Sequence, residues 1–134
     1  MALLLAQVGT HTARRFAARV AELGLTPAHV GVLRLVGQRP GLSQQALAES
    51  LGVVPSKVVL LVDDLEARKV VERRRDPTDR RQYALHLSAD ADEELARVRD
   101  VVRRHDEDIT AGLTATERKQ LLALLSKVAA AQGL

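Results

Sequence analysis

The chain has 134 residues, which is enough for one domain and too few for two ordinary ones, and its formal net charge is +3. Apolar residues make up 46% of it, yet Phe16 and Tyr83 are its only aromatic ones. This composition favours helices packed through Leu, Val and Ala, and it disfavours a protein that stacks single-stranded bases on aromatic rings. Because the chain has no cysteine, disulfides, cysteine-ligated zinc and thiol redox sensing are excluded.

The first predicted helix runs from near the N-terminus to about Leu23, and Gly24 stands where a helix C-terminal cap is expected. The apolar opening run, residues 2–6, is far too short for a membrane span and lacks the basic start of a signal peptide. We therefore expect a soluble, cytoplasmic protein without a membrane partner. The apolar stripe of this helix consists of Leu5, Val8, Phe16, Val20 and Leu23, with Thr12 as a weak member.

A second helix is predicted from Pro27, because Thr26 is a favoured N-cap and proline suits the first helical position. Its expected inward residues are Val30, Leu33 and Val36. Glycine and proline residues at positions 37–41 then mark a break in the chain.

Two short helices joined by a glycine-containing turn follow. Ser43 is the expected N-cap of the first, Gly52 lies in the turn, and Pro55 begins the second. One face of the second carries apolar residues at i, i+3, i+4 and i+7, namely Val58, Leu61, Val62 and Leu65. This arrangement is typical of a helix-turn-helix.

After the fourth helix the apolar period changes to that of strands. Residues 70–75 and 82–87 read as two strands, and the Asp- and Pro-containing residues 76–79 read as the turn between them. A β-hairpin directly after a helix-turn-helix makes a winged helix. The expected fold is therefore mainly α with a small β-hairpin wing.

The positive charge is concentrated in this wing. Residues 68–81 contain seven basic and three acidic side chains, so this segment carries +4 and the other 120 residues sum to −1. A local basic patch on a neutral body is expected of a surface that binds a polyanion. The alternative is a solvated charged loop, and the helix-turn-helix beside the patch favours the first interpretation.

Two helices close the chain. Ser88 is the expected N-cap of a long fifth helix, and Thr114 with Glu117 forms a capping box that opens the sixth. The apolar stripe of the fifth helix consists of Ala91, Leu95, Val98, Val102, His105 and Ile109. Because the terminal helices have little to bury against in one chain, we expect a two-fold dimer in which they interlock; the alternative is a monomer with a small terminal bundle.

Four stretches carry a resemblance to one family: residues 23–27 (LGLTP), 42–48 (LSQQALA) with 51–53 (LGV), 62–66 (VDDLE), and 72–81 (ERRRDPTDRR) leading into 85–88 (LHLS). Together they resemble the MarR family of bacterial transcriptional regulators over essentially the whole chain, and the Asp-Arg-Arg of the wing is the most specific part. The resemblance implies a dimeric winged-helix protein that binds duplex DNA, with a small-molecule cleft near the first, second and fifth helices. Residues 26–88 would be the DNA-binding region, and residues 1–25 and 89–134 the dimerisation region, within one integrated domain.

The chain departs from the family pattern at three places. A glycine usually ends the recognition helix where Lys69 stands, so Lys69 must adopt a left-handed conformation or the helix must end differently. A small polar and a basic residue usually stand where Val59 and Leu60 lie, which changes how bases are read. The glycine common at the start of the fifth helix is absent from residues 88–92.

The outward face of the fourth helix supplies the first candidates for DNA contact. Ser56 and Lys57 can donate hydrogen bonds to phosphates or base edges in the major groove. Leu60, and with it Val59, can contact a thymine methyl group, or both can pack internally. Asp63 and Asp64 would repel phosphate, so we expect them to pair with Arg68 or with the wing.

The third helix and the wing supply the other candidates. Gln44, with Gln45, can clamp a phosphate at a helix N-terminus. Arg80 or Arg81 at the wing tip can enter an A·T-rich minor groove. Strand alternation places Arg73 and Arg75 on one face, where they can contact phosphate, and Asp79 is expected to stabilise the tip by pairing with an arginine.

The histidines suggest no metal site, because they are scattered and lack ligand spacing. His11 and His29, with Leu33, can line a ligand cleft; the alternative is that the histidines are satisfied surface residues. His105 lies on the fifth-helix stripe and is expected at a dimer interface. Nothing in the sequence indicates an enzyme: we find no nucleophile–base pair, no phosphate-binding glycine loop and no converging carboxylates. No cofactor is expected.

The sequence thus predicts a homodimeric, sequence-specific transcriptional regulator on a pseudo-palindromic double-stranded DNA operator. We expect a repressor released by a small-molecule effector, with an activator as the alternative. A second hypothesis is a winged-helix protein-interaction module without DNA binding. Its support comes from Val59, Leu60, Asp63 and Asp64 on the recognition helix.

Overall fold

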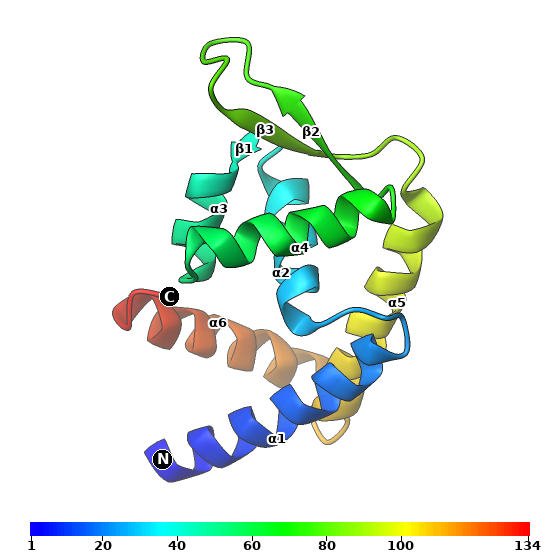
Figure 1. Ribbon diagram of the computed structural model, residues 1–134. Coiled ribbons are helices and arrows are strands. Elements are labelled where there is room, and N and C mark those ends of the chain that lie inside the picture. Colours follow the sequence, from blue (N-terminus) through cyan, green and yellow to red (C-terminus); the bar gives the residue numbers. More distant parts are fainter.

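Six helices and a three-stranded antiparallel sheet make up the computed structural model, which describes residues 1–134 (Figure 1). The elements are α1 (Ala2–Ala21), α2 (Pro27–Gln38), β1 (Leu42–Ser43), α3 (Gln44–Leu51), α4 (Pro55–Ala67), β2 (Val71–Arg75), β3 (Tyr83–Leu87), α5 (Asp92–Ile109) and α6 (Ala115–Ala131). The predicted fold, a winged helix-turn-helix flanked by terminal helices, is confirmed.

The sheet has the order β1-β3-β2. In the hairpin, Val71 pairs with Leu87 and Arg75 with Tyr83, so the wing extends beyond residue 75 as a loop. The two-residue strand β1, in which Leu42 pairs with Leu85, was not predicted, because a strand this short has no periodicity of its own. It joins the start of the helix-turn-helix to the base of the wing.

The core lies between α2, α3, α4 and the sheet and is aliphatic, as the composition predicted. Its most completely buried large side chains include Leu47, Leu65 and Leu85, each 0% exposed. On α2, Leu33 and Val36 are buried as predicted, whereas Val30 is only half-buried. The helix buries instead a wider face than the stripe indicated, with Val32 and Leu35 added.

The predicted N-caps are confirmed at Thr26, Ser43 and Thr114, where each side chain accepts a backbone N–H of the first turn. The expectation for Ser88 was wrong. The chain makes one more turn before α5 begins, and the N-cap is Ala91, without a side-chain bond. Its backbone N–H instead donates to the Ser88 carbonyl. The first helix likewise ends before its expected cap, at Ala21, and Gly24 lies in the turn that follows.

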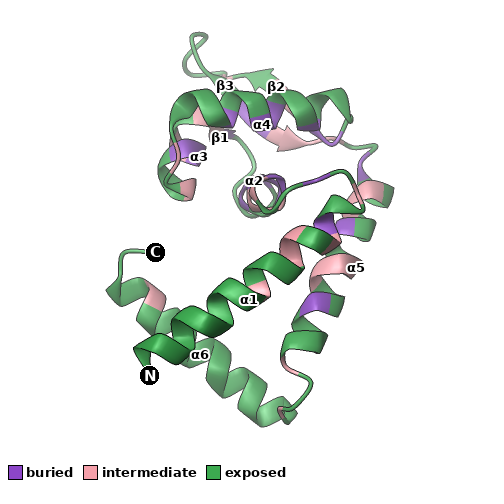
Figure 2. Cartoon of the chain, turned by 60° about the horizontal axis from the view of Figure 1, so that its bottom comes forward, coloured by how far each residue is buried: buried purple, intermediate pink, exposed green.

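The terminal helices are far less buried than the winged module (Figure 2). Helix α1 packs along α5, with the Phe16 ring 5.1 Å from that of His105. Helix α6 contains no buried residue, although it carries Leu122 and Leu124, which are 69% and 60% exposed. None of the helices combines the length and the apolar character that a membrane span requires.

Candidate nucleic-acid interface

Helix α4 divides into a buried face and an exposed face. The four apolar residues expected to point inward, Val58, Leu61, Val62 and Leu65, are all buried. Opposite them, Ser56 and Lys57 are exposed, Leu60 is 65% exposed and Val59 is 38% exposed. Internal packing is therefore excluded for Leu60, which projects from the middle of the helix.

The wing loop carries two arginines on its exposed tip. Arg80 and Arg81 are both exposed and form no ion pair within the chain. The backbone beneath them is held by Asp76, whose Oδ1 accepts hydrogen bonds from the Thr78 hydroxyl and N–H at 2.7 and 2.8 Å. These bonds lower the pKa of Asp76, so its carboxylate stays charged.

Asp79 also stabilises the tip, by a contact other than the one expected. It pairs with no guanidinium; its Oδ1 accepts the backbone N–H of Arg81 at 3.0 Å. A short acidic side chain commonly bonds the backbone two residues on in a turn. Arg75 acts nearby: it donates to the carbonyl of Arg80 at 2.9 Å and lies over the Tyr83 ring, 5.6 Å from its centre.

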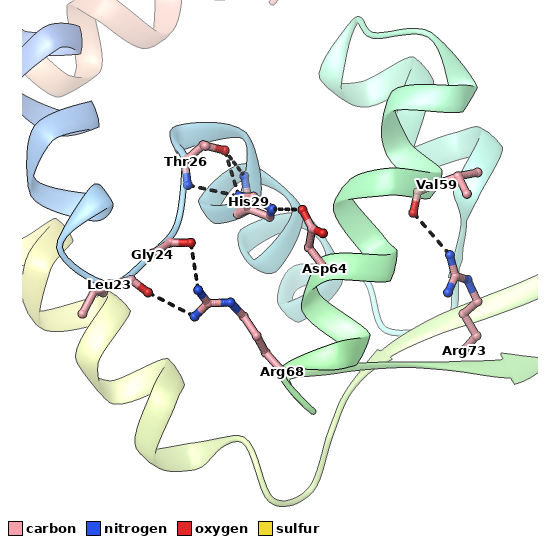
Figure 3. A network of polar contacts seen from close by, with 8 residues as sticks. All are labelled: Leu23, Gly24, Thr26, His29, Val59, Asp64, Arg68 and Arg73. Carbon is pink, nitrogen blue, oxygen red and sulfur yellow. Dashed lines mark hydrogen bonds and ion pairs between the residues drawn. The ribbon is translucent and has the colours of Figure 1, made fainter.

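Arg73 connects the wing to the helix-turn-helix. Its guanidinium donates to Asp63 at 2.6 Å and Glu66 at 3.0 Å on α4, and to the Gln44 side chain at 2.8 Å on α3. It also reaches the Val59 carbonyl at 3.4 Å (Figure 3). The side chain is only 14% exposed.

These contacts occupy the donors of Arg73 inside the protein, so they do not favour the phosphate contact predicted for it. They bear out the expectation that Asp63 pairs with the wing. The same contacts surround a groove of about 510 Å³ between α3, α4 and the wing, lined by Gln44, Val59, Glu66, Arg73 and Tyr83. The Arg73 guanidinium thus offsets part of the negative charge that Asp63 and Glu66 place beside this groove.

The C-terminal half of α4 is attached to the junction between α1 and α2 (Figure 3). Asp64 accepts a hydrogen bond from His29 Nε2 at 3.0 Å, rather than pairing with Arg68 or the wing as expected. Arg68 turns away from the basic surface. It donates to the carbonyls of Leu23 at 3.0 Å and Gly24 at 2.8 Å, and pairs with Glu94 of α5 at 3.1 Å.

Comparison with known proteins identifies this arrangement. A family model described as the MarR family matches residues 23–82. A protein of Thauera aromatica named for transcriptional regulation of the hcr operon is 39% identical over 116 residues, which span 86% of this chain and 70% of the relative.

Two solved structures extend the likeness over nearly the whole chain. The transcriptional repressor CouR, bound to a 23-mer DNA duplex, is 33% identical with a TM-score of 0.84, covering 96% of this chain and 92% of that one. The MarR family protein Rv2887 of Mycobacterium tuberculosis, in complex with salicylic acid, is 30% identical with a TM-score of 0.75, covering 96% and 95%. The chain belongs to the MarR family.

This MarR-family chain ends its recognition helix with a left-handed lysine. Lys69 has φ 59°, and its N–H donates to the Glu66 carbonyl at 2.9 Å. Of the two expected solutions, the left-handed turn is the one adopted. A non-glycine residue pays about 1 kcal/mol for this conformation.

The residues expected to line a ligand cleft lie in two places: His29 and Leu33 are one turn apart on α2, and His11 lies on α1. Leu33 is buried in the core, 5% exposed. His29 is buried in a capping box, in which Nδ1 accepts the Thr26 N–H at 3.0 Å and leaves Nε2 to donate to Asp64. The spacing of His29, a polar residue three positions after the Thr26 cap, could have indicated this capping role from the sequence.

His11 is exposed and borders a separate hollow. The hollow has a volume of about 380 Å³, lies between α1 and the end of α5, and is lined by Gln7, Val8, His11, Thr12, Arg15, Asp108 and Ile109. Both Arg15 and Arg19 pair with Asp108 there, and the hydrogen bond from Arg19 lowers the pKa of that carboxylate. No cluster of metal-ligating side chains is present.

His105 packs inside its own chain, 7% exposed, against Phe16; it was expected at a dimer interface. The α1–α5 contact covers it because Phe16 and His105 face each other along the two helices. Burial lowers the pKa of its ring, and the nearby charge of Arg19 lowers it further. Its Nδ1 has no hydrogen-bond partner.

Proposed function

We propose that the chain is a homodimeric, sequence-specific DNA-binding repressor whose affinity for its operator is changed by a small-molecule effector. One observation carries this proposal. The N-terminal half of α4 exposes Ser56 and Lys57, the wing tip exposes Arg80 and Arg81 without an ion-pair partner, and Asp63 on the same helix is paired with Arg73. Helix α4 would enter the major groove and the wing tip the adjacent minor groove.

The DNA contacts of the helix-turn-helix would come from Gln44, Ser56, Lys57 and Leu60. Those of the wing tip would come from Arg80 and Arg81. Arg73 and Asp79 would act as positioning residues that hold the wing in place, and the exposed Arg75 would contact phosphate as predicted while one of its nitrogens holds the Arg80 carbonyl. The interaction-module alternative is not favoured. Asp63 and Asp64, which supported it, are engaged by Arg73 and His29 within the chain.

A second copy of the chain would cover the apolar surface of α6 and of the start of α1. Leu3 and Leu122 are 73% and 69% exposed in the single chain, and no residue of α6 is buried. Large contiguous apolar surfaces are rare on monomers. Residues 1–25 and 89–134 would form this dimerisation region, and its two-fold axis would match a pseudo-palindromic operator.

The effector belongs to the proposal because the MarR family relative Rv2887 is solved with salicylic acid. A ligand that binds between the dimerisation helices and the winged modules would change the spacing of the two α4 helices. It would release DNA only if it binds the dimer with the altered α4 spacing more tightly than the dimer with the spacing that fits DNA.

The test is binding of fluorescent duplexes, selected from a random pool, to the wild-type chain and to Arg80→Ala/Arg81→Ala. We expect the double variant to lose tenfold or more in affinity while keeping its oligomeric state. The matched control is Arg97→Ala/Arg99→Ala on α5, which removes the same two charges from an exposed surface elsewhere. Equal loss in both variants, or no duplex binding at low salt, would overturn the proposal.

A further inference from the structure

The outward stripe of α4 is unusual for a DNA-reading helix because an apolar side chain occupies its centre. Ser56, Leu60 and Asp63 follow one another at helical spacing, opposite the buried residues Val58 and Val62. Leu60 is 65% exposed, and nothing in its own chain covers it. A single exposed leucine is ordinary on a protein surface, so its meaning depends on the groups around it.

The acidic groups that follow Leu60 on α4 make contacts within the chain. Asp63 is bound by Arg73 at 2.6 Å, and Asp64 by His29 at 3.0 Å, so each carboxylate has one oxygen engaged within the chain. Arg73 makes the bonds described above, and Arg68 donates to carbonyls of the α1–α2 junction. Helix α4 contains no arginine, Arg68 and Arg73 are held within the chain, and Lys57, one turn before Leu60, is the exposed cation of this face.

Leu60 itself can read a base edge only by apolar contact, because its side chain has no hydrogen-bond donor or acceptor. In the major groove only thymine presents an apolar group, its C5-methyl. We propose that Leu60 reads the C5-methyl group of a thymine in each half-site, and that this residue determines operator specificity at that position. The inference rests on the proposed function and adds to it the base that is recognised and the residue that recognises it.

Deoxyuridine provides a probe that removes this methyl group and nothing else. It keeps the Watson–Crick pair, the hydrogen-bonding edge in the major groove and the whole minor-groove edge. In a duplex selected by the wild-type protein, thymines are replaced by deoxyuridine in symmetric pairs, one pair at a time, and affinity is measured by fluorescence anisotropy. Losing one buried methyl contact costs about fourfold in affinity, and losing both of a symmetric pair about fifteenfold.

The variants assign the effect to Leu60. Leu60→Ala should bind the thymine and deoxyuridine duplexes equally at the sensitive position, because the contact is already lost. Leu60→Met keeps an apolar side chain of similar volume and should keep the discrimination. Because residue 60 lies on the surface, both variants should unfold at the temperature of the wild type.

Arg80→Ala serves as the control for weakened binding. The wing tip is expected in the minor groove, so this variant should bind both duplexes more weakly and leave their ratio unchanged. Strong wild-type binding with no sensitive thymine pair, or discrimination that persists in Leu60→Ala, would overturn the assignment of Leu60 and leave the proposed function standing. Absence of binding to every duplex would overturn the proposed function and this inference with it.

Discussion

His29 of α2 donates from Nε2 to the carboxylate of Asp64 on α4 across 3.0 Å, while its Nδ1 accepts the backbone N–H of Thr26. One imidazole therefore closes the first turn of α2 and joins it to the recognition helix. It occupies the position of a capping-box residue, which is usually Glu or Gln. The orientation of α4 thus depends on a residue outside the helix-turn-helix.

Replacing His29 by alanine should lower the free energy of unfolding by about 1–2 kcal/mol, because the cap loses one of its two bonds and Asp64 its partner. Urea denaturation followed by circular dichroism gives the value. His11→Ala is the control, since His11 is exposed and lies outside the core. Equal stability of the two variants would show that the His29 bridge contributes nothing.

Arg73→Ala should destabilise the chain by about 1–3 kcal/mol, because charged acceptors on α4 lose a donor that is only 14% exposed. The neighbouring Arg74 provides the comparison: it pairs only with Glu72 on its own strand and is 55% exposed. Arg74→Ala should change stability by less than about 0.5 kcal/mol. A similar loss in both variants would argue against a clamp between wing and helix.

The affinity for the selected duplex should fall steeply with salt. Each arginine that neutralises a phosphate adds about 0.9 to the slope of log K against log salt concentration. Arg81→Ala should therefore flatten the slope by about 0.9 for each subunit, whereas Arg97→Ala on α5 should leave it unaltered. Titrations from low to physiological salt measure both, and an unchanged slope in Arg81→Ala would remove that residue from the phosphate contacts.

Stability should decline on acidification below about pH 6.5, the unperturbed pKa of histidine. Burial and the charge of Arg19 lower the pKa of His105 in the folded chain, so between this lowered pKa and 6.5 the unfolded chain binds more protons. The stability that neutral, buried His105 contributes is fully present above the pKa of histidine in the unfolded chain. It is lost as the pH falls toward the lower pKa of His105 in the folded chain. His105→Gln should show a flatter pH dependence of unfolding free energy than the wild type, and an equally steep dependence would contradict the prediction.

The apolar surface of α6 should determine the oligomeric state. Leu122→Glu places a charge on the surface proposed to bury against a second copy, so it should shift the protein to monomer in analytical ultracentrifugation and lower the melting temperature. Lys127→Glu changes charge on the polar side of the same helix and should leave the dimer intact. A wild-type sedimentation profile for Leu122→Glu would place the interface elsewhere.

Local patterns predicted most of the fold because they depend on neighbouring residues. The i, i+3, i+4, i+7 spacing of Val58 to Leu65 and the alternation in residues 82–87 located α4 and β3 to within a residue or two. The two-residue strand β1 was missed, since its pairing with β3 exists only after the chain has folded. Ser88 was assigned a cap because residue type does not reveal the extra turn before α5.

The candidate site shows the same division. The exposure of Ser56, Lys57 and Leu60 followed from helical periodicity. The partners of Arg73 did not, because strand alternation identifies the face of a side chain and leaves open what lies opposite it. His29 and Asp64 are 35 positions apart, and only the packing of α2 on α4 brings them within hydrogen-bonding distance.

The contact between Arg68 and Gly24 has an evolutionary consequence. Gly24 has φ +70°, and the space that a Cβ would occupy there is filled by the Arg68 guanidinium. Any larger residue at position 24 would displace that guanidinium and would also strain the backbone, because φ is positive there. The end of an arginine can shift but the left-handed backbone cannot, so glycine should persist at position 24 among descendants of this chain even where position 68, 44 positions away, changes.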